Sequence, residues 1–183
     1  MCSSDLEVGV ELYQHMLEEA VAEARGAARA ETAEAWAPQI NLGMPVLIPE
    51  SYVADLGVRL SLYRRLGGLV DAAEIEAFAA ELVDRFGPLP IEVENLLEVI
   101  AIKRLCRAAG IDKVEAGPKG CLLSFRQNRF AKPEKLVAYI GRRASDINLR
   151  PDHKLVVRQN WDSAKSRVSG IRNLMKEIAA LAA

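Results

Sequence analysis

The spacing of the apolar residues changes near residue 110, and this change limits the folds open to the chain more than any other feature of the sequence. Before it, apolar residues recur every three or four positions, as on one face of a helix. After it, short apolar runs alternate with turn residues, as in strands. Helices and strands are therefore partly segregated along the chain, which favours an α+β fold over a doubly wound sheet.

Glycine and proline residues delimit three helices before the change. The first is expected over residues 52–66, before Gly67-Gly68. The second is expected over 71–86, with Asp71 as N-cap and Glu74 at the capping-box position, and Gly87-Pro88 ends it. Pro90 opens the third, which runs to about residue 109 and is closed by Gly110.

The strands are expected in short pieces. Residues 39–48 suggest one or two strands, although Pro45 does not suit a central position because it cannot donate a ladder hydrogen bond. Two hairpins follow, over 111–125 with a turn at 117–120 and over 146–158 around Pro151-Asp152. A short helix after Pro133 and a final helix capped by Asp162 or Ser163 complete a small sheet packed with several helices.

The N-terminal part has a different composition. Residues 7–35 are expected to form a helix, but residues 24–37 are rich in alanine and glutamate and carry no bulky aliphatic side chain. Such a segment buries little apolar surface, so we expect a helical or frayed linker that Pro38 ends. We therefore divide the chain into an N-terminal helix and linker, residues 1–37, and a globular domain, residues 38–183.

Charge is distributed unevenly along the chain. Residues 1–102 hold 6 Lys/Arg and 18 Asp/Glu, whereas residues 103–183 hold 18 Lys/Arg and 7 Asp/Glu. Such polarity bears on partners and association rather than on fold. Two readings stay open: the halves neutralise each other across the folded surface, or each half meets a partner of opposite charge.

The sequence lacks the motifs that catalysis or cofactor binding requires. It has neither a P-loop nor a dinucleotide-binding glycine motif. The two histidines, His15 and His153, lack a second ligand at helical spacing, and the three cysteines are too scattered for a zinc site. We expect no enzyme activity, cofactor or metal in this chain. Without a signal peptide or an apolar run of ~20 residues, a cytoplasmic, membrane-free protein is expected.

Two charged surfaces are candidate interaction sites. The basic one could contact nucleic acid through Arg126, Arg129, Lys132, Arg142 and Arg143, with Lys165, Arg167, Arg172 and Lys176 adding to it. Phe125 and Phe130 are interleaved with it, but we expect them in the core. The acidic one is the helix face of Glu74, Glu81 and Asp84, which would suit arginines on a partner, or could be a plain solvated face.

Several segments of the globular part resemble the C-terminal domain of bacterial transcription-repair-coupling factors (Mfd). They include residues 40–49, the helix containing residues 59–63, and the run Glu81-Leu-Val-Asp84-Arg-Phe-Gly-Pro-Leu-Pro90. The resemblance continues through residues 110–125 to the closing amphipathic helix. Residues 7–25 resemble the segment that follows the motor motifs of these proteins.

The resemblance implies a regulatory role. The parent proteins are ATP- and magnesium-dependent DNA translocases that release stalled RNA polymerase and recruit the excision-repair protein UvrA. Their C-terminal domain docks on an N-terminal UvrB-like module and hides its UvrA-binding surface. Arginines of that module face the acidic pair that corresponds to Glu81 and Asp84. The resemblance thus implies an autoinhibitory clasp, with DNA, UvrA and RNA polymerase reached only through the parent protein.

Overall fold

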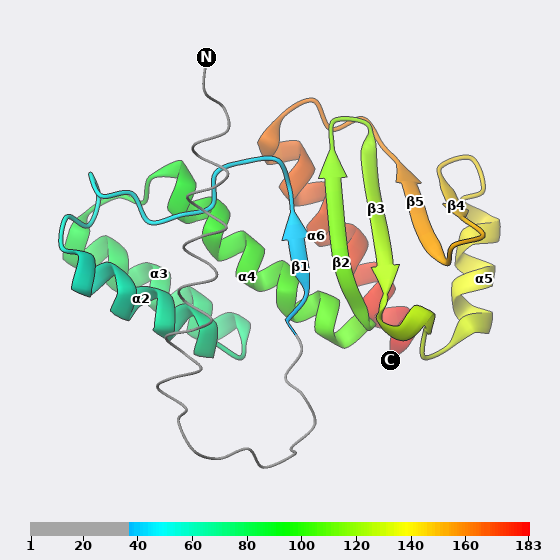
Figure 1. Cartoon of the computed structure of the whole chain (residues 1–183), viewed down its shortest axis with the longest axis horizontal. Coiled ribbons are helices and arrows are strands. Elements are labelled where there is room, and N and C mark those ends of the chain that lie inside the picture. The colour runs from blue at the N-terminus through cyan, green and yellow to red at the C-terminus, as the bar shows by residue number, and fades with distance from the viewer. Residues whose placement is uncertain (1–36) are drawn as a thin grey trace, which may run out of the picture. The chain divides into compact units, whose positions relative to one another are not determined.

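The computed structural model describes residues 37–183, which contain five α-helices and a five-stranded mixed sheet (Figure 1). This arrangement confirms the expected α+β class. The helix expected over residues 7–35 lies outside the described residues. The described chain divides into two compact units, one of residues 47–93 and one of residues 37–46 with 94–183.

The first unit contains helices α2 (Leu56–Gly68) and α3 (Ala72–Phe86). Helix α2 begins four residues later than expected, because the chain at Tyr52 turns back on the carbonyl of Pro49 and the Asp55 side chain caps the helix by accepting a hydrogen bond from the backbone N–H of Val58 at 2.8 Å. Helix α3 has the expected Asp71 cap and ends at Gly87, whose φ is 90°.

The core of the first unit lies on the inner faces of these two helices. Its buried residues recur at three- and four-residue spacing, as a helical stripe requires, and in α3 they are Ile75, Phe78 and Leu82. The loop before α2 is fixed to the same core. The Tyr52 hydroxyl donates to the carbonyl of Gly87 at 2.8 Å, and its ring lies 5.8 Å from that of Phe86.

The second unit is built around the sheet, in the order β1-β2-β3-β5-β4. The strands are β1 (Gln39–Asn41), β2 (Ile111–Gly117), β3 (Gly120–Phe125), β4 (Ile147–Leu149) and β5 (Lys154–Arg158). β1 pairs with β2 in parallel, and the other neighbours are antiparallel. Both expected hairpins are therefore confirmed, and the turn at 117–120 is tight, with Gly117 paired to Gly120.

The first strand is shorter than the sequence suggests. It ends at Asn41, whose side-chain oxygen accepts a hydrogen bond from the Gly43 N–H at 3.0 Å, and Gly43 has a φ of 63°. Asn41 and Gly43 turn the chain out of the sheet. The apolar residues Val46 and Ile48, which made the strand expectation extend to residue 48, therefore lie outside β1. Pro45 therefore lies outside any strand, and β1 is an edge strand, in agreement with the expectation that proline avoids a central position.

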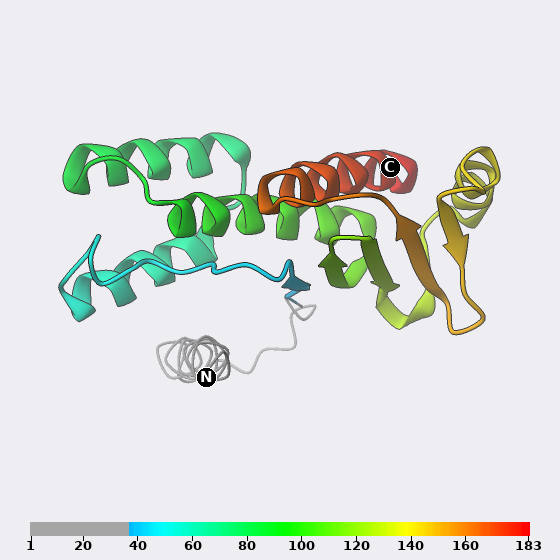
Figure 2. The ribbon, with the colours of Figure 1, turned by 90° about the horizontal axis from the view of Figure 1, so that it is seen from above.

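Helices cover one face of the sheet. Figure 2 shows α4 (Ile91–Ala109) and α6 (Ala164–Ala182) stacked behind the strands, with α5 (Pro133–Arg142) at the β4 edge. Alternate strand residues point into this layer, among them Leu123, Leu155 and Val157, and α6 contributes Ile171 and Met175. A β-bulge at Asp112 shifts the alternation in β2. Ser163 provides the expected cap of α6.

Candidate interaction site

The acidic face of α3 is already partly engaged within the first unit. The carboxylate of Glu81 accepts two hydrogen bonds from the Arg65 guanidinium of α2, at 2.7 and 2.6 Å, and a third from Arg85 at 3.1 Å. Arg65 also lies over the ring of Phe78, 5.0 Å from its centroid. These contacts form a charged cluster of one carboxylate and two guanidinium groups, which links α2 to α3.

The cluster shifts the titration of its carboxyl group. Hydrogen bonds from Arg65 and then Arg85 lower the pKa of Glu81 from 4.5 to about 2. Glu81 is therefore ionised at every physiological pH. Its side chain remains 34% exposed, so water and an incoming guanidinium group can both reach it, and the energy of such an exposed pair is small.

Asp84 is placed differently from Glu81. It is exposed, and within residues 37–183 its carboxylate has neither a hydrogen bond nor an ion pair. It lies one turn beyond Ala80 and two turns beyond Ala77, so the three share the outer face of α3. Val83 beside it is 45% exposed. The outer face thus presents small and apolar side chains with two exposed carboxylates that have no partner within residues 37–183, Asp84 and Glu76.

Glu74 has a structural task. Its Oε2 accepts hydrogen bonds from the backbone N–H groups of Val70 at 2.6 Å and Asp71 at 3.4 Å, while the Asp71 side chain accepts from the Glu74 N–H at 2.8 Å. This is the reciprocal capping box that the sequence predicts. The three acidic residues on one helix face therefore do different things: Glu74 caps, Glu81 links two helices, and Asp84 is unpaired.

The basic residues proposed for nucleic-acid contact fall into two groups in the second unit. Arg126, Arg129 and Lys132 precede α5, whereas Arg142 and Arg143 end it. A ten-residue helix separates the groups by ~15 Å. Arg143 pairs with Glu177 at 3.1 Å, and Lys132 donates to the carbonyl of Ala183.

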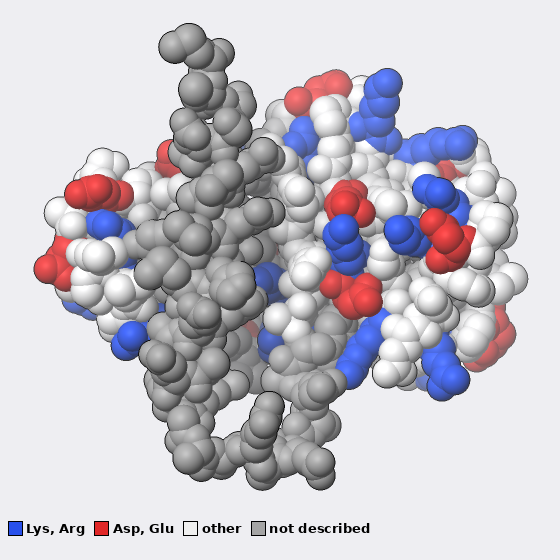
Figure 3. Space-filling view, in the orientation of Figure 1, with Lys and Arg blue, Asp and Glu red and all other residues white. Residues whose placement is uncertain are grey.

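One other residue of the basic set is buried, and another is paired while its side chain stays 43% exposed. Arg167 is only 8% exposed and donates to the carbonyl of Leu42 at 2.7 Å, so its assignment to a positive surface was wrong. Arg172 pairs with Glu98 of α4 at 2.9 Å. Phe125 is buried and stacks edge-to-face on Phe130, which confirms their place in the core. On the side shown in Figure 3, acidic and basic side chains of the sheet alternate.

Sequence reasoning missed the partners of Glu81. Arg85 could have been found, because an acid and a base four residues apart on a helix form a pair. Arg65 could not, because the loop between α2 and α3 and the packing of their buried side chains decide which residues of the two helices face each other. Over residues 37–183 the structure has no cluster of three or more metal-binding side chains and no helix able to cross a membrane.

The comparisons with known proteins agree on one family. The model of the TRCF domain matches residues 42–136. The transcription-repair-coupling factor of Rickettsia conorii is 41% identical over 150 residues, which are 82% of this chain and 13% of that protein. The factor of Escherichia coli K12 is 30% identical over 174 residues, 93% of this chain and 15% of that protein. The chain thus spans about a seventh of these relatives.

The fold gives a second, independent agreement. The crystal structure of the C-terminal domain of a transcription-repair coupling factor superposes with a TM-score of 0.60 at 19% identity, over 79% of this chain and 95% of that one. At this identity the likeness concerns the fold alone. The family model covers more than half of the sequence. The matched residues include α2, α3 with its acidic face, and the β2–β3 hairpin. The chain therefore belongs to the TRCF domain family, the C-terminal domain of transcription-repair-coupling factors.

Proposed function

We propose that this chain is a regulatory protein-interaction domain without catalytic activity of its own, which docks through α3 on the UvrB-like N-terminal module of a transcription-repair-coupling factor. The observation that carries the proposal is the outer face of α3, where an unpaired carboxylate, Asp84, lies beside exposed Ala80 and Val83. Small side chains allow close approach of a partner, and an unpaired carboxylate suits an arginine on it.

The proposal places the chain in a larger protein. The parent would use ATP and magnesium to move on DNA, release stalled RNA polymerase and recruit UvrA in the bacterial cytoplasm. In that protein the docked domain would cover the UvrA-binding surface until the motor engages a stalled polymerase. The relatives' names, which concern coupling of transcription to repair, support this setting.

The charged cluster suits a contact that must open again. Solvent screens exposed ion pairs, so Glu81 can exchange Arg65 or Arg85 for a guanidinium group of the partner at little cost. Coupling of ~1–3 kcal/mol is enough to bias a regulatory equilibrium. We therefore assign the first contact to Asp84 and a secondary, exchangeable contact to Glu81.

Isothermal titration of this chain against the isolated UvrB-like module of a full-length relative tests the proposal. Replacement of Asp84 by lysine (Asp84→Lys) is expected to weaken binding by at least about tenfold, because it places like charges at the contact. Glu81→Lys should weaken binding less in the presence of 0.3 M salt than at low salt. Glu134→Lys, an exposed acid-to-base change on α5, is the matched control and should leave binding unchanged.

Two results would contradict the proposal. Absence of binding by the unchanged chain at micromolar concentrations would remove the clasp altogether. Equal weakening by Asp84→Lys and Glu134→Lys would show that only net charge matters and that α3 is not the contact. Circular dichroism of each variant excludes loss of the fold as the cause.

A second function is supported by one local feature. Arg126, Arg129 and Lys132 follow one another around the 3-10 turn before α5, and Arg129 is exposed. We propose that this turn contacts nucleic-acid phosphate if the domain binds DNA directly. The affinity for a DNA duplex should then fall steeply between 50 and 200 mM salt and fall further in Arg129→Glu. No retention at 50 mM salt would end this alternative.

A further inference from the structure

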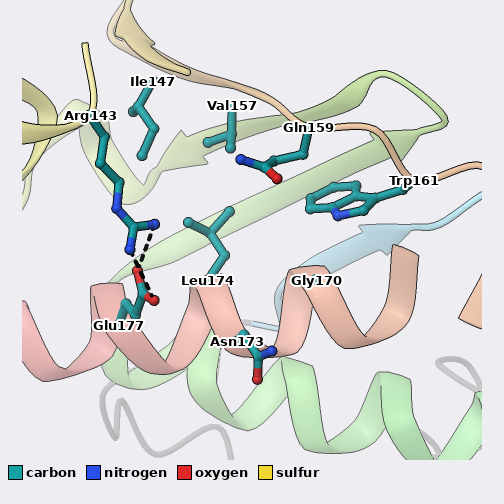
Figure 4. A pocket seen from close by; sticks show the side chains of 9 residues that line it. All are labelled: Arg143, Ile147, Val157, Gln159, Trp161, Gly170, Asn173, Leu174 and Glu177. Atoms are coloured by element: carbon teal, nitrogen blue, oxygen red, sulfur yellow. Dashed lines mark hydrogen bonds and ion pairs between the residues drawn. The ribbon is translucent and has the colours of Figure 1, made fainter. Parts of the chain in front are cut away.

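A cavity lies between α6 and the outer strands of the sheet in the second unit. It has a volume of ≈ 210 Å³, and Figure 4 shows how its side chains converge. Ile147 of β4, Val157 of β5 and Leu174 of α6 form its apolar lining, and Gln159 and Asn173 bring amide groups. The volume is below the ~300–1,000 Å³ of typical small-molecule sites, so the cavity fits a single side chain better than a cofactor.

Side-chain contacts close the two ends of the cavity. At one end Arg143 and Glu177 form an ion pair, and Tyr139 donates its hydroxyl hydrogen to the same carboxylate. At the other end Trp161 lies directly against Gly170, where a Cβ atom would come within 2.3 Å of the indole. The glycine lets the indole pack on α6, and Trp161 is only 6% exposed. The cavity is therefore a formed feature of the fold.

A basic hollow adjoins the cavity. Lys119, Arg158, Gln159 and Asn160 line an open depression of ≈ 340 Å³, and Gln159 lines both spaces. Within residues 37–183, neither Lys119 nor Arg158 has a side-chain hydrogen bond or ion pair. Both are exposed, and Figure 3 shows basic side chains gathered over this upper end of the sheet. Of the nearby carboxylates, Asp162 and Glu177 already have partners. Asp146, whose backbone carbonyl accepts a hydrogen bond from the Arg158 N–H at 2.7 Å, is exposed and has no side-chain partner within residues 37–183.

The charge around the two spaces favours an acidic occupant. Residues 142–183, which supply most of the lining, hold nine Lys/Arg and only four Asp/Glu. The cavity has a mixed apolar and polar lining and lies beside two unpaired cations. It fits a peptide that places an apolar side chain among Val157, Leu174 and Trp161 and a neighbouring carboxylate on Lys119 or Arg158. A nucleic acid could bind Lys119 and Arg158 through its phosphates, but it has no aliphatic side chain to fill the cavity.

We propose that this surface is a second interaction site, distinct from α3, which binds an acidic peptide segment of a partner protein through one buried apolar side chain and adjacent carboxylates. The apolar side chain supplies most of the affinity by leaving water, and the cations select for acidic neighbours. The site does not depend on the α3 contact, because none of its residues belongs to the first unit.

A direct test uses Trp161 as the reporter. In the full chain carrying Trp36→Phe, Trp161 is the one remaining tryptophan. Its indole N–H then gives the one tryptophan side-chain cross-peak in a two-dimensional ¹H–¹⁵N NMR spectrum. Titration with acetyl-Glu-Glu-Leu-Phe-Glu-Glu-amide is expected to shift this peak in a saturable way. Peptides with Gly-Ser in place of Leu-Phe, or with lysine in place of glutamate, should shift it little.

The variant Lys119→Glu/Arg158→Glu is expected to weaken binding of the acidic peptide at least about tenfold. Its matched control is Arg129→Glu/Lys135→Glu, which makes the same change of charge on exposed residues beyond the other end of β3. The control should bind as the parent chain does.

Three outcomes would overturn the proposal. One is no shift with the acidic peptide at millimolar concentration. Another is an equal shift with the Gly-Ser or lysine peptides, since binding would then need no apolar side chain or no acidic charge. The third is displacement of the peptide by a single-stranded oligothymidylate, which would assign the cations to nucleic acid. The α3 variant Asp84→Lys should leave the titration unchanged, so failure here and failure of the clasp are distinguishable.

Discussion

Trp161 and Gly170 lie in very close contact in the second unit. The indole closes one end of the cavity and lies so close to α6 that only a glycine fits opposite it. Gly120 is constrained in a comparable way, because a Cβ atom there would lie 1.9 Å from the carbonyl oxygen of Val157 on the neighbouring strand. At both positions the methyl group of an alanine would overlap with neighbouring atoms, the indole of Trp161 or the backbone of Val157, that are held in place by packing.

Replacement of Gly170 by alanine (Gly170→Ala) tests this close packing. We expect it to lower the free energy of unfolding by about 1–3 kcal/mol, because the new methyl group overpacks the indole. Urea denaturation followed by tryptophan fluorescence measures the loss. Gly141→Ala on α5 is the control: nothing lies within 4 Å of its Cβ position, so alanine should be neutral or stabilise the helix by up to ~1 kcal/mol. Equal effects of the two substitutions would contradict the close packing.

The ionic link between helices α2 and α3 is the cluster of Arg65, Glu81 and Arg85. Because the folded pKa of Glu81 is about 2, below the usual 4.5, its ionised form is favoured in the folded state. The contribution to stability is fully present above pH ~4.5 and is lost as the pH falls toward ~2. Arg85 of α3 provides part of this contribution within one helix, and Arg65 of α2 provides the larger part between the two helices.

We therefore predict a pH-dependent effect of Glu81→Gln. At pH 6 the urea midpoint of the variant should lie below that of the parent chain, and the difference should shrink between pH 4.5 and 2.5. Asp84→Asn, which removes a carboxylate without an arginine partner, provides the baseline. A constant difference for Glu81→Gln over this range would show that the ion pairs do not stabilise the folded chain.

Across the whole second unit, the core joins elements that are far apart in sequence. Cys106 of α4 is fully buried, and its sulfur lies 3.5 Å from that of Met175 on α6. Cys121 of β3 is also buried. Burial raises the pKa of both thiols to about 12. A buried thiol in apolar surroundings is inert, so these cysteines report on opening of the core.

The corresponding prediction uses a Cys2→Ser variant, which leaves these two thiols. At pH 8 the folded protein should react with Ellman's reagent only as fast as the core opens, because the thiols are almost wholly protonated and out of reach. In 8 M urea both should react at once. Rapid reaction of either thiol without denaturant would contradict the burial that the structure shows.

Local sequence signals determined most of the secondary structure. The capping box of Asp71 and Glu74, the break at Gly87 and the turn between Gly117 and Gly120 act over a few residues, so they can be recognised from the sequence. The D-R-F-G-x-L-P run identified the family for the same reason. The start of α2 was misplaced because the cap at Asp55 competes with a helical pattern that begins earlier.

Only the tertiary structure decided which charges of different elements meet. Sequence spacing placed Glu74 in a capping box and Arg85 four residues from Glu81, but only the fold brought Arg65 to Glu81 and left Asp84 unpaired. Likewise it buried Arg167 and left Lys119 and Arg158 unpaired beside a cavity. Pairing between elements depends on loop geometry and side-chain packing over long separations, and no short-range pattern encodes these. The sequence by itself thus determined the elements and the family, and the fold determined the surfaces through which the domain can act.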